Sequence, residues 1–285
     1  MQQRTPSGAT RPALSGLSRR VALLASALVL AGCGSLQSGT PRAAAPAATS
    51  APVHVMTSGG FTAAYNDLRP AYETQSGRTV QTAYGASMGN ATDAIPTRLG
   101  RGEPADVVIL ARDALDALVK AGKVVPGSQV DLVRSSIGLA VKKGAPRPDI
   151  GTVEALKRTL LAAPSIAYSA SASGTYYETE MLKKLGIEAQ VMPKSRRILS
   201  ERVGTVVARG DAALGLQQVS ELLPIEGIDY LGPLPAEVQR VTVFSAGIAS
   251  ASTQPEAARD LIRYLQSPAA TPTIRKTGLE PIPAP

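Results

Sequence analysis

The chain of 285 residues is long enough for one or two domains with a sizeable core. Its one cysteine excludes an internal disulfide and thiolate-rich zinc or iron–sulfur sites, and its one histidine excludes a His-rich metal site. The net charge of +8 would suit nucleic acid, but the four arginines of residues 1–32 supply half of it, and only 4% of the residues are aromatic. The composition therefore argues against a nucleic-acid partner and against a bound metal.

Residues 1–32 have the pattern of a secretory leader. Two arginines precede the apolar run 21–31, which is shorter than the roughly 20 residues of a membrane-spanning helix. The run is followed by Gly and Cys, and this end resembles the lipobox of bacterial lipoproteins, where cleavage precedes a lipidated cysteine. We therefore predict a signal peptide over 1–32, lipidation at Cys33 and a flexible tether over 33–52. The protein would be periplasmic and held to the membrane only by its lipid anchor; the alternative is a plain signal peptide with an incidental cysteine.

Beyond residue 52, short β-rich runs alternate with helical stretches, several of which begin or end at typical capping residues. The predicted strands cover residues 53–57, 79–84, 106–110, 137–141, 165–168, 213–217 and 242–246. The predicted helices cover residues 62–74, 113–120, 153–161, 177–185 and 255–265. This alternation predicts an α/β fold with mainly parallel sheets.

Three loops that follow predicted strands are rich in Ser and Gly. They are residues 57–60 (TSGG), 85–90 (GASMGN) and 169–175 (SASASGT). In open α/β sheets ligands bind beyond the carboxyl ends of the strands, where helix N-termini favour anions. If these loops converge, they would enclose a small carboxylate or oxyanion, although Ser and Gly are also common in ordinary strand-to-helix turns.

Four segments, in this order, resemble the molybdate-binding-like family of type II periplasmic solute-binding proteins: VHVMTSGGFTAAYNDLRPAYE, RGEPADVVIL, SIAYSASASGTYY and GDAALGLQQVSELLP. The resemblance covers residues 53–281, and its most specific part is the run PADVV. It implies a two-lobed periplasmic binding protein fold of type II with the ligand in the inter-lobe cleft. One lobe would comprise 53–137 plus 240–285 and the other 138–239. A small anion would be the ligand and an ABC permease a partner, with the protein itself a monomer.

The family's site surrounds the oxyanion with Ser hydroxyls, backbone N–H groups and a Tyr hydroxyl. In this sequence Gly60 stands where the family has Ser, and Gln218 where it has Tyr. If Arg202 faces the cleft, a carboxylate is favoured over molybdate, because a guanidinium binds carboxylates through paired hydrogen bonds. The alternative places Arg202 on a solvated helix face. The resemblance and these differences give the predicted ligand-binding set Ser58, Gly59, Gly60, Ser87, Met88, Ser173, Gly174, Arg202 and Gln218.

The segments YGASMGNATDAIP, SIAYSASASG and LGLQQVSELLP also resemble the aconitate isomerases, enzymes built on the same fold. That resemblance implies a cofactor-independent proton shift along an unsaturated tricarboxylate, which needs carboxylate clamps and an acid–base group. Candidate acid–base groups are Tyr177, Glu201 and Lys194, and the sequence does not choose among them. The first interpretation is an extracytoplasmic solute-binding protein that captures a small anion, and the isomerase is the alternative; the sequence does not decide between binding and conversion. The dinucleotide and nucleoside-triphosphate binding motifs are absent from the sequence.

Overall fold

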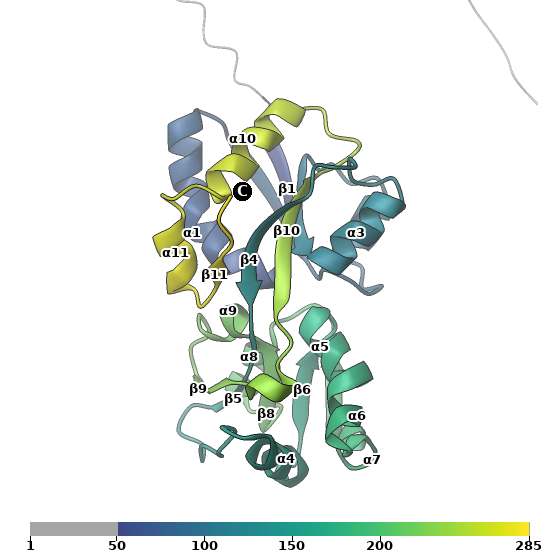
Figure 1. The fold of residues 1–285 in the computed structure, drawn as a ribbon, viewed down its shortest axis with the longest axis vertical. Helices are drawn as coiled ribbons and strands as arrows, with labels where there is room; N and C mark the ends of the chain where they lie inside the picture. The colour runs from purple at the N-terminus through teal and green to yellow at the C-terminus, as the bar shows by residue number, and fades with distance from the viewer. Residues whose placement is uncertain (1–50, 285) are drawn as a thin grey trace, which may run out of the picture. The chain divides into compact units, whose positions relative to one another are not determined.

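The computed structural model describes residues 51–284 (Figure 1). The predicted signal peptide, the lipidation site Cys33 and most of the tether lie outside the described residues. The described residues form one compact unit, and its strands belong to two separate sheets, one in each of two lobes. The predicted two-lobed α/β fold is therefore confirmed. None of the helices in the described part of the chain is both long and apolar enough to cross a membrane.

The first lobe contains a six-stranded sheet in the order β11-β4-β10-β3-β1-β2. Strand β1 is parallel to both β2 and β3, whereas β10 is antiparallel to β3 and β4. The strands are β1 (Val53–Ser58), β2 (Val80–Gly85), β3 (Val107–Ala111), β4 (Val130–Ser135), β10 (Thr242–Ile248) and β11 (Glu280–Pro281). The helices are α1 (Gly59–Ser76), α2 (Ile95–Gly100), α3 (Arg112–Lys120), α10 (Pro255–Leu265) and α11 (Thr271–Lys276).

Side chains of β1 and β3 alternate between two apolar clusters, because successive residues of a strand point to opposite faces of the sheet. Val55 and Ile109 pack in the cluster that α1 and α10 cover, whereas Met56 and Val108 pack in the cluster that α2 and α3 cover. Helices therefore cover both faces of these strands. This double burial explains the unbroken apolar sequence of β3.

The second lobe contains a five-stranded sheet in the order β7-β6-β8-β5-β9. Its strands are β5 (Ile137–Lys142), β6 (Ile166–Ser169), β7 (Ser195–Ile198), β8 (Leu214–Gln218) and β9 (Ile228–Pro233). Its helices are α4 (Val153–Ala162), α5 (Ala172–Tyr176), α6 (Leu182–Leu185), α7 (Glu188–Val191), α8 (Val203–Arg209) and α9 (Val219–Leu222), with a π-helical turn over Tyr177–Met181 joining α5 to α6.

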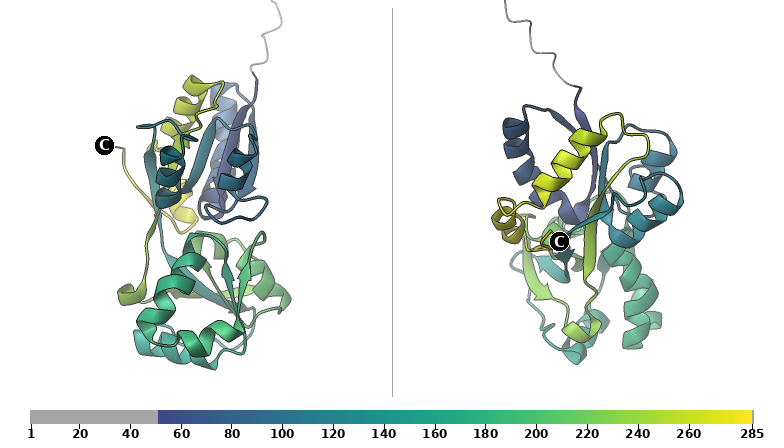
Figure 2. Two further views of the ribbon diagram at one scale, coloured as in Figure 1. Left: turned by 90° about the vertical axis from the view of Figure 1, so that its right-hand side faces the viewer. Right: turned by 45° about the horizontal axis from the view of Figure 1, so that its top comes forward.

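The chain passes between the two sheets at two places that lie side by side. Only Ser136 separates β4 of the first sheet from β5 of the second, and residues 239–241 lead back into β10 (Figures 1 and 2). The Gln239 side chain ties the two crossings together, because its Oε1 accepts from the backbone N–H of Ile137 at 2.9 Å and its Nε2 donates to the Ile137 carbonyl at 2.9 Å.

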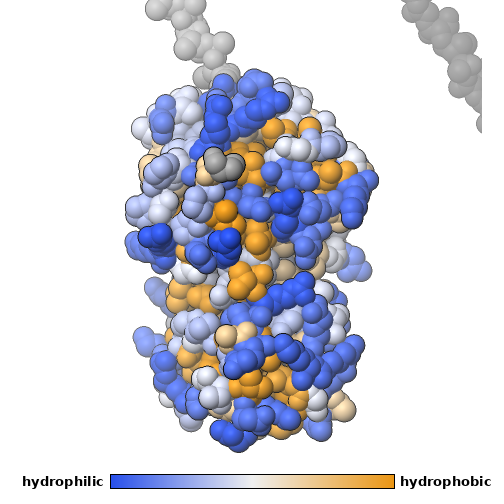
Figure 3. Space-filling view, viewed as in Figure 1, coloured by the Kyte–Doolittle hydropathy of each residue, from blue (hydrophilic) through white to orange (hydrophobic). Residues whose placement is uncertain are grey.

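Every predicted strand and helix is present, and most bounds differ from the prediction by one to three residues. The largest difference is in the predicted helix 177–185, because the helical segment begins at Ala172. The prediction of mainly parallel sheets is wrong, because both sheets are mixed. Strands β5 and β10 each follow a crossing and enter their sheets from the inter-lobe side, so they run antiparallel to the strands beside them. The face in Figure 3 shows hydrophilic residues over both lobes, with smaller apolar patches between them.

Candidate functional site

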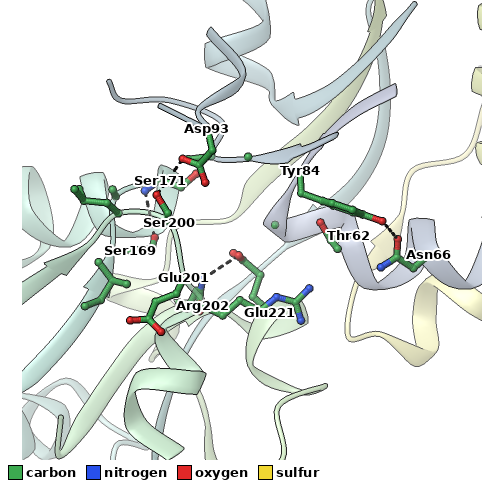
Figure 4. Close-up of a pocket in the computed structure, with 17 residues that line it drawn as sticks. Thr62, Asn66, Tyr84, Asp93, Ser169, Ser171, Ser200, Glu201, Arg202 and Glu221 are labelled. Atoms are coloured by element: carbon green, nitrogen blue, oxygen red, sulfur yellow. Dashed lines mark hydrogen bonds between the residues drawn. The ribbon is translucent and has the colours of Figure 1, made fainter. Parts of the chain in front are cut away.

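A cavity of about 370 Å³ lies between the two lobes, at the carboxyl ends of β1, β2, β6, β7 and β8 (Figure 4). This is where open α/β sheets bind ligands, because strand ends and helix N-termini present free backbone groups there. Both lobes contribute to its wall. The residues lining it are Gly59, Thr62, Asn66, Tyr84, Gly85, Ala86, Asp93, Ser169, Ala170, Ser171, Ile198, Leu199, Ser200, Glu201, Arg202, Gln217 and Glu221.

The first-lobe wall is built around the N-terminus of α1. Ser58 precedes this helix in an extended conformation, but its side chain makes no capping hydrogen bond. Its Oγ is buried and has no hydrogen-bond partner among the described residues. Thr62 instead donates to the Ser58 carbonyl at 3.0 Å, and Tyr84 donates to Asn66 Oδ1 at 2.7 Å. The N–H groups of the first turn of a helix have no partner within the helix. Gly59 and Thr62 of this turn line the cavity, and Ser58 directly precedes them.

The two lobes touch at the edges of this cavity. Ser200 of the second lobe donates to Asp93 Oδ1 of the first lobe at 3.1 Å, a bond drawn in Figure 4. The backbone N–H of Ser87 donates to Ser171 Oγ at 3.2 Å. Ser220 on α9 donates to the Gly60 carbonyl on α1 at 2.7 Å. These contacts come from loops and helix starts of both lobes, so the cavity is bounded on several sides by inter-lobe hydrogen bonds.

A buried carboxyl group forms part of the second-lobe wall. Glu221 on α9 is 7% exposed, and its Oε1 accepts a hydrogen bond from Gln217 Nε2 at 2.9 Å. The Gln217 amide is itself oriented, because its Oε1 accepts from the backbone N–H of Val203 at 2.9 Å. Burial raises the pKa of the Glu221 carboxyl from 4.5 to about 7, against the opposing effects of the Arg202 charge and the Gln217 hydrogen bond.

Two glycines at the start of α1 allow close packing on its two sides. A Cβ on Gly59 would lie 1.9 Å from Glu221 Oε1 of the second lobe, and a Cβ on Gly60 would lie 2.1 Å from the ring of Phe244 on β10 of the first lobe. The absence of a side chain at Gly59 therefore lets the α9 carboxyl approach the N-terminus of α1. Gly60 is also the position where the resembled family has Ser, and here the Phe244 ring occupies the space that a side chain would need.

Of the predicted ligand-binding residues, Gly59 and Arg202 line the cavity. Ser58 lies directly before Gly59, and Gly60 directly after it. Ser173 is buried just behind the wall segment Ser169–Ser171, with its Oγ 3.1 Å from Ser169 Oγ.

Gly174 is held by its close approach to β6. An added Cβ would lie 1.5 Å from the Ser169 carbonyl oxygen, so Gly174→Ala has no room without moving the backbone of a wall segment. We expect this variant to lose ligand binding together with more than about 2 kcal/mol of stability, because the neighbouring atom is backbone and cannot rotate away. Urea unfolding and a ligand titration of the same preparation measure both; unchanged values would show that the wall can shift.

Three other predicted residues lie outside the lining of this cavity. Ser87 is buried and its Oγ accepts from the backbone N–H of Ala111 at 3.0 Å. Met88 lines a neighbouring cavity. Gln218 is buried at the end of β8, where its Nε2 donates to Thr242 Oγ1 at 2.9 Å. Their positions support the loops of the wall and the second crossing.

The three predicted acid–base candidates lie in different surroundings. Tyr177 is buried in the second-lobe core, where its hydroxyl is 2.7 Å from Ser195 Oγ. Lys194 is outside the cavity and donates to the Leu161 carbonyl at 2.6 Å. Glu201 lines the cavity, but Figure 4 shows its carboxyl turned away from the centre, and Arg209 binds both of its oxygens at 2.8 and 3.1 Å. These hydrogen bonds lower the pKa of Glu201.

Sequence reasoning missed Glu221. The signal was available in the quoted segment LGLQQVSELLP, where one acidic residue stands in an otherwise apolar and uncharged stretch just beyond a predicted strand. Such a carboxyl at a strand-to-helix junction is placed near the ligand side of the sheet. Within residues 51–284, no group of three or more His, Cys, Asp and Glu side chains is placed to hold a metal ion.

The two-lobed fold, with its cavity at facing strand ends, defines a type II periplasmic binding protein architecture. A family model described as "Bacterial extracellular solute-binding protein" matches residues 53–280, and the chain belongs to this family. The family is extracytoplasmic, which agrees with the periplasmic location expected from the sequence and leaves the lipid anchor a prediction.

The chain is similar to two relatives and to one solved structure. An aconitate isomerase from a Pseudomonas species is 45% identical over 249 residues, which cover 87% of this chain and 94% of that protein. The molybdate-binding protein ModA of Azotobacter vinelandii is 28% identical over 242 residues, which cover 81% of this chain and 91% of that protein. In a structural superposition, the Azotobacter vinelandii periplasmic molybdate-binding protein gives a TM-score of 0.66 at 20% identity, covering 81% of this chain and 100% of that one.

Proposed function

We propose that this protein is an isomerase of an unsaturated tricarboxylate that interconverts trans- and cis-aconitate in the inter-lobe cavity without a cofactor. The observation that carries the proposal is the 45% identity to an aconitate isomerase along nearly the whole of both chains. The cavity of about 370 Å³ is in the size range of small-molecule sites, which begins near 300 Å³.

The chemistry of the cavity supports an anionic substrate. Arg202, immediately before α8, supplies a permanent positive charge in its wall, and a guanidinium matches the two oxygens of a carboxylate. The N-terminus of α1 and the unpartnered Ser58 hydroxyl offer donors for a second carboxylate. A tricarboxylate would thus be held by both lobes. Binding at two carboxylates would fix the position of the carbon chain between them, as a proton shift along that chain requires.

Turnover of trans-aconitate by the purified protein tests this function. We expect cis-aconitate to accumulate to its equilibrium share with no added metal, nucleotide or redox partner. The conversion is followed by chromatography or by proton NMR of the vinyl signals. A preparation that binds trans-aconitate but leaves it unchanged over hours would contradict the isomerase proposal.

Removing the cavity arginine should weaken substrate binding. For Arg202→Ala we expect at least a tenfold rise in the dissociation constant for trans-aconitate, because one charge-assisted carboxylate contact is worth about 1.5 to 3 kcal/mol. Isothermal titration calorimetry measures the change. Arg158→Ala is the matched control, since Arg158 is exposed on α4 and lies outside this cavity. Equal affinities of the two variants would show that Arg202 does not contact the substrate.

A second candidate is a binding subunit that delivers a small anion to an ABC permease. It is favoured by the 28% identity to ModA over 81% of the chain. A thermal-shift panel of molybdate, tungstate, sulfate, citrate and both aconitates separates the two, because a bound ligand stabilises the folded state by about 2.7 kcal/mol at a hundredfold excess over its Kd. A large shift with molybdate and none with carboxylates would favour the transport role.

We also propose that Cys33 is the lipidated first residue of the mature, monomeric protein. The lipobox-like sequence before it supports this. Cys33→Ser should release the protein from the membrane fraction. Metabolic labelling with a fatty acid should label the wild-type protein and not the Cys33→Ser variant. Membrane association that persists in Cys33→Ser would contradict lipid anchoring.

A further inference from the structure

We propose that Glu221 is the catalytic base and acid of this site, the group that takes a proton from the bound tricarboxylate and returns it to another carbon. The inference rests on the proposed isomerase function and adds a residue that sequence reasoning did not single out. Figure 4 shows the Glu221 carboxyl pointing into the group of cavity residues.

The geometry separates Glu221 from the other ionisable side chains of the cavity. Glu201 is bound on both oxygens by Arg209, and Asp93 accepts a hydrogen bond from Ser200 at the exposed edge. The Tyr84 hydroxyl donates to Asn66 and its side chain is 42% exposed. Glu221, in contrast, is almost fully buried, and no cation of the described residues forms an ion pair with it.

One hydrogen bond holds the Glu221 carboxyl and leaves its second oxygen free to exchange a proton. Gln217 donates to one oxygen, Oε1, and is locked by the N–H of Val203. No described residue hydrogen-bonds to the other oxygen, Oε2. Burial brings the pKa of this carboxyl to about 7, against the Arg202 charge, so both protonation states are accessible near neutral pH. An acid–base group works best under this condition.

The proposed step balances within the substrate and Glu221. The Glu221 carboxylate removes a proton from the methylene carbon of trans-aconitate, so that a C–H bond breaks and an O–H bond forms. The released electron pair is delocalised over the three-carbon unit and the adjoining carboxylate, and the double bond moves. Glu221 then returns the proton to the former vinyl carbon, which forms the new C–H bond and regenerates the carboxylate. The reaction consumes no oxidant, reductant or water.

Gly59 gives an independent way to disturb this carboxyl. A Cβ at position 59 would lie 1.9 Å from Glu221 Oε1, which is the mobile end of a side chain and can move aside. Gly59→Ala should therefore fold normally yet displace the carboxyl from its present position. The Glu221 proposal predicts that this small substitution, distant in the sequence, lowers kcat.

The test compares Glu221→Gln with the wild-type protein. Glu226→Gln, an exposed glutamate five positions further along, is the matched control. We expect Glu221→Gln to lose at least 100-fold in kcat, the range of general acid–base catalysis, while trans-aconitate still binds within about fivefold. Deuterium uptake into trans-aconitate from D₂O should fall in parallel. Gly59→Ala should lose at least tenfold in kcat, and Glu226→Gln should match the wild type. Circular dichroism and the retained binding show that the variants are folded.

The outcomes are separable. If the wild type is active and the kcat of Glu221→Gln lies within threefold of the wild-type kcat, the role of Glu221 is overturned and the isomerase function stands. A wild type that converts no aconitate and exchanges no deuterium overturns the isomerase function, and the role of Glu221 with it. Loss of both kcat and binding in Glu221→Gln, together with a fully active Gly59→Ala, would assign Glu221 to structure and overturn its catalytic role.

Discussion

Replacing Asp106 by alanine is expected to lower the free energy of unfolding by about 3 to 5 kcal/mol. Asp106 is 2% exposed and, directly before β3, anchors two segments to the start of that strand. Its Oδ2 accepts from the backbone N–H of His54 at 2.8 Å, and its Oδ1 accepts from Ser252 Oγ at 2.7 Å and from the N–H of Gln254 at 3.3 Å. Truncation would leave these three partly buried donors without their partner, and each such loss costs about 1 to 3 kcal/mol when water does not replace the acceptor.

Urea unfolding followed by circular dichroism measures this loss. Asp67→Ala is the control, because Asp67 is exposed on α1 and a surface substitution of this kind changes stability by less than about 0.5 kcal/mol. The result bears on the most specific part of the sequence resemblance, the run PADVV, whose aspartate is buried and hydrogen-bonded. If Asp106→Ala lowers the free energy of unfolding no more than Asp67→Ala does, water replaces the Asp106 carboxylate as a hydrogen-bond acceptor without cost.

The Glu221 carboxyl should make the folded protein less stable as the pH rises. Its pKa is raised in the folded state from 4.5 to about 7, so the folded state favours the protonated form. The stability that the protonated carboxyl contributes to the folded state is fully present below pH 4.5 and is lost as the pH rises through 7. A shift of this size corresponds to about 3 kcal/mol, given 1.36 kcal/mol per unit.

Glu221→Gln removes that titration and keeps an oxygen that can accept from Gln217. We expect it to match the wild type in urea unfolding at pH 4.5 and to exceed it by about 2 to 3 kcal/mol at pH 8. A difference that is constant between pH 4.5 and pH 8 would mean that the carboxyl titrates alike in the folded and unfolded states. Bound trans-aconitate should be absent from these measurements, since it stabilises the folded state by itself.

The elements predicted from sequence are those whose pattern is strong by itself. Strand β3 is buried on both faces and reads as a continuous apolar run, and α10 has a Pro in its first turn and an apolar stripe. The elements missed have weaker patterns. Strand β7 is an edge strand that contains two exposed arginines, and β9 at the other edge has no buried residue. Their strand character comes from pairing with a neighbour, which local sequence does not encode.

The sequence predicted which loops form the site better than it predicted which side chains carry its chemistry. Ser- and Gly-rich strand ends indicated where the ligand side of each lobe lies, and the position of Arg202 in the cavity agrees with one of the two alternatives for that residue. The surroundings of Glu221 depend on α1 of the other lobe, because Gly59 borders its carboxyl across a separation of 162 positions. A raised pKa is a property of burial by distant segments, so no local pattern reports it.

The order of strands in the first sheet sets the order in which the protein can fold as it is synthesised. Strand β10 lies between β3 and β4, although it follows the whole second sheet in the chain. The first sheet therefore has an unfilled position until residues 242–248 have been made, whereas the second sheet is complete at residue 233. The inserted lobe can form its core first. Until β10 is made, β3 and β4 of the first lobe each have an unpaired edge, which is prone to mispairing during folding.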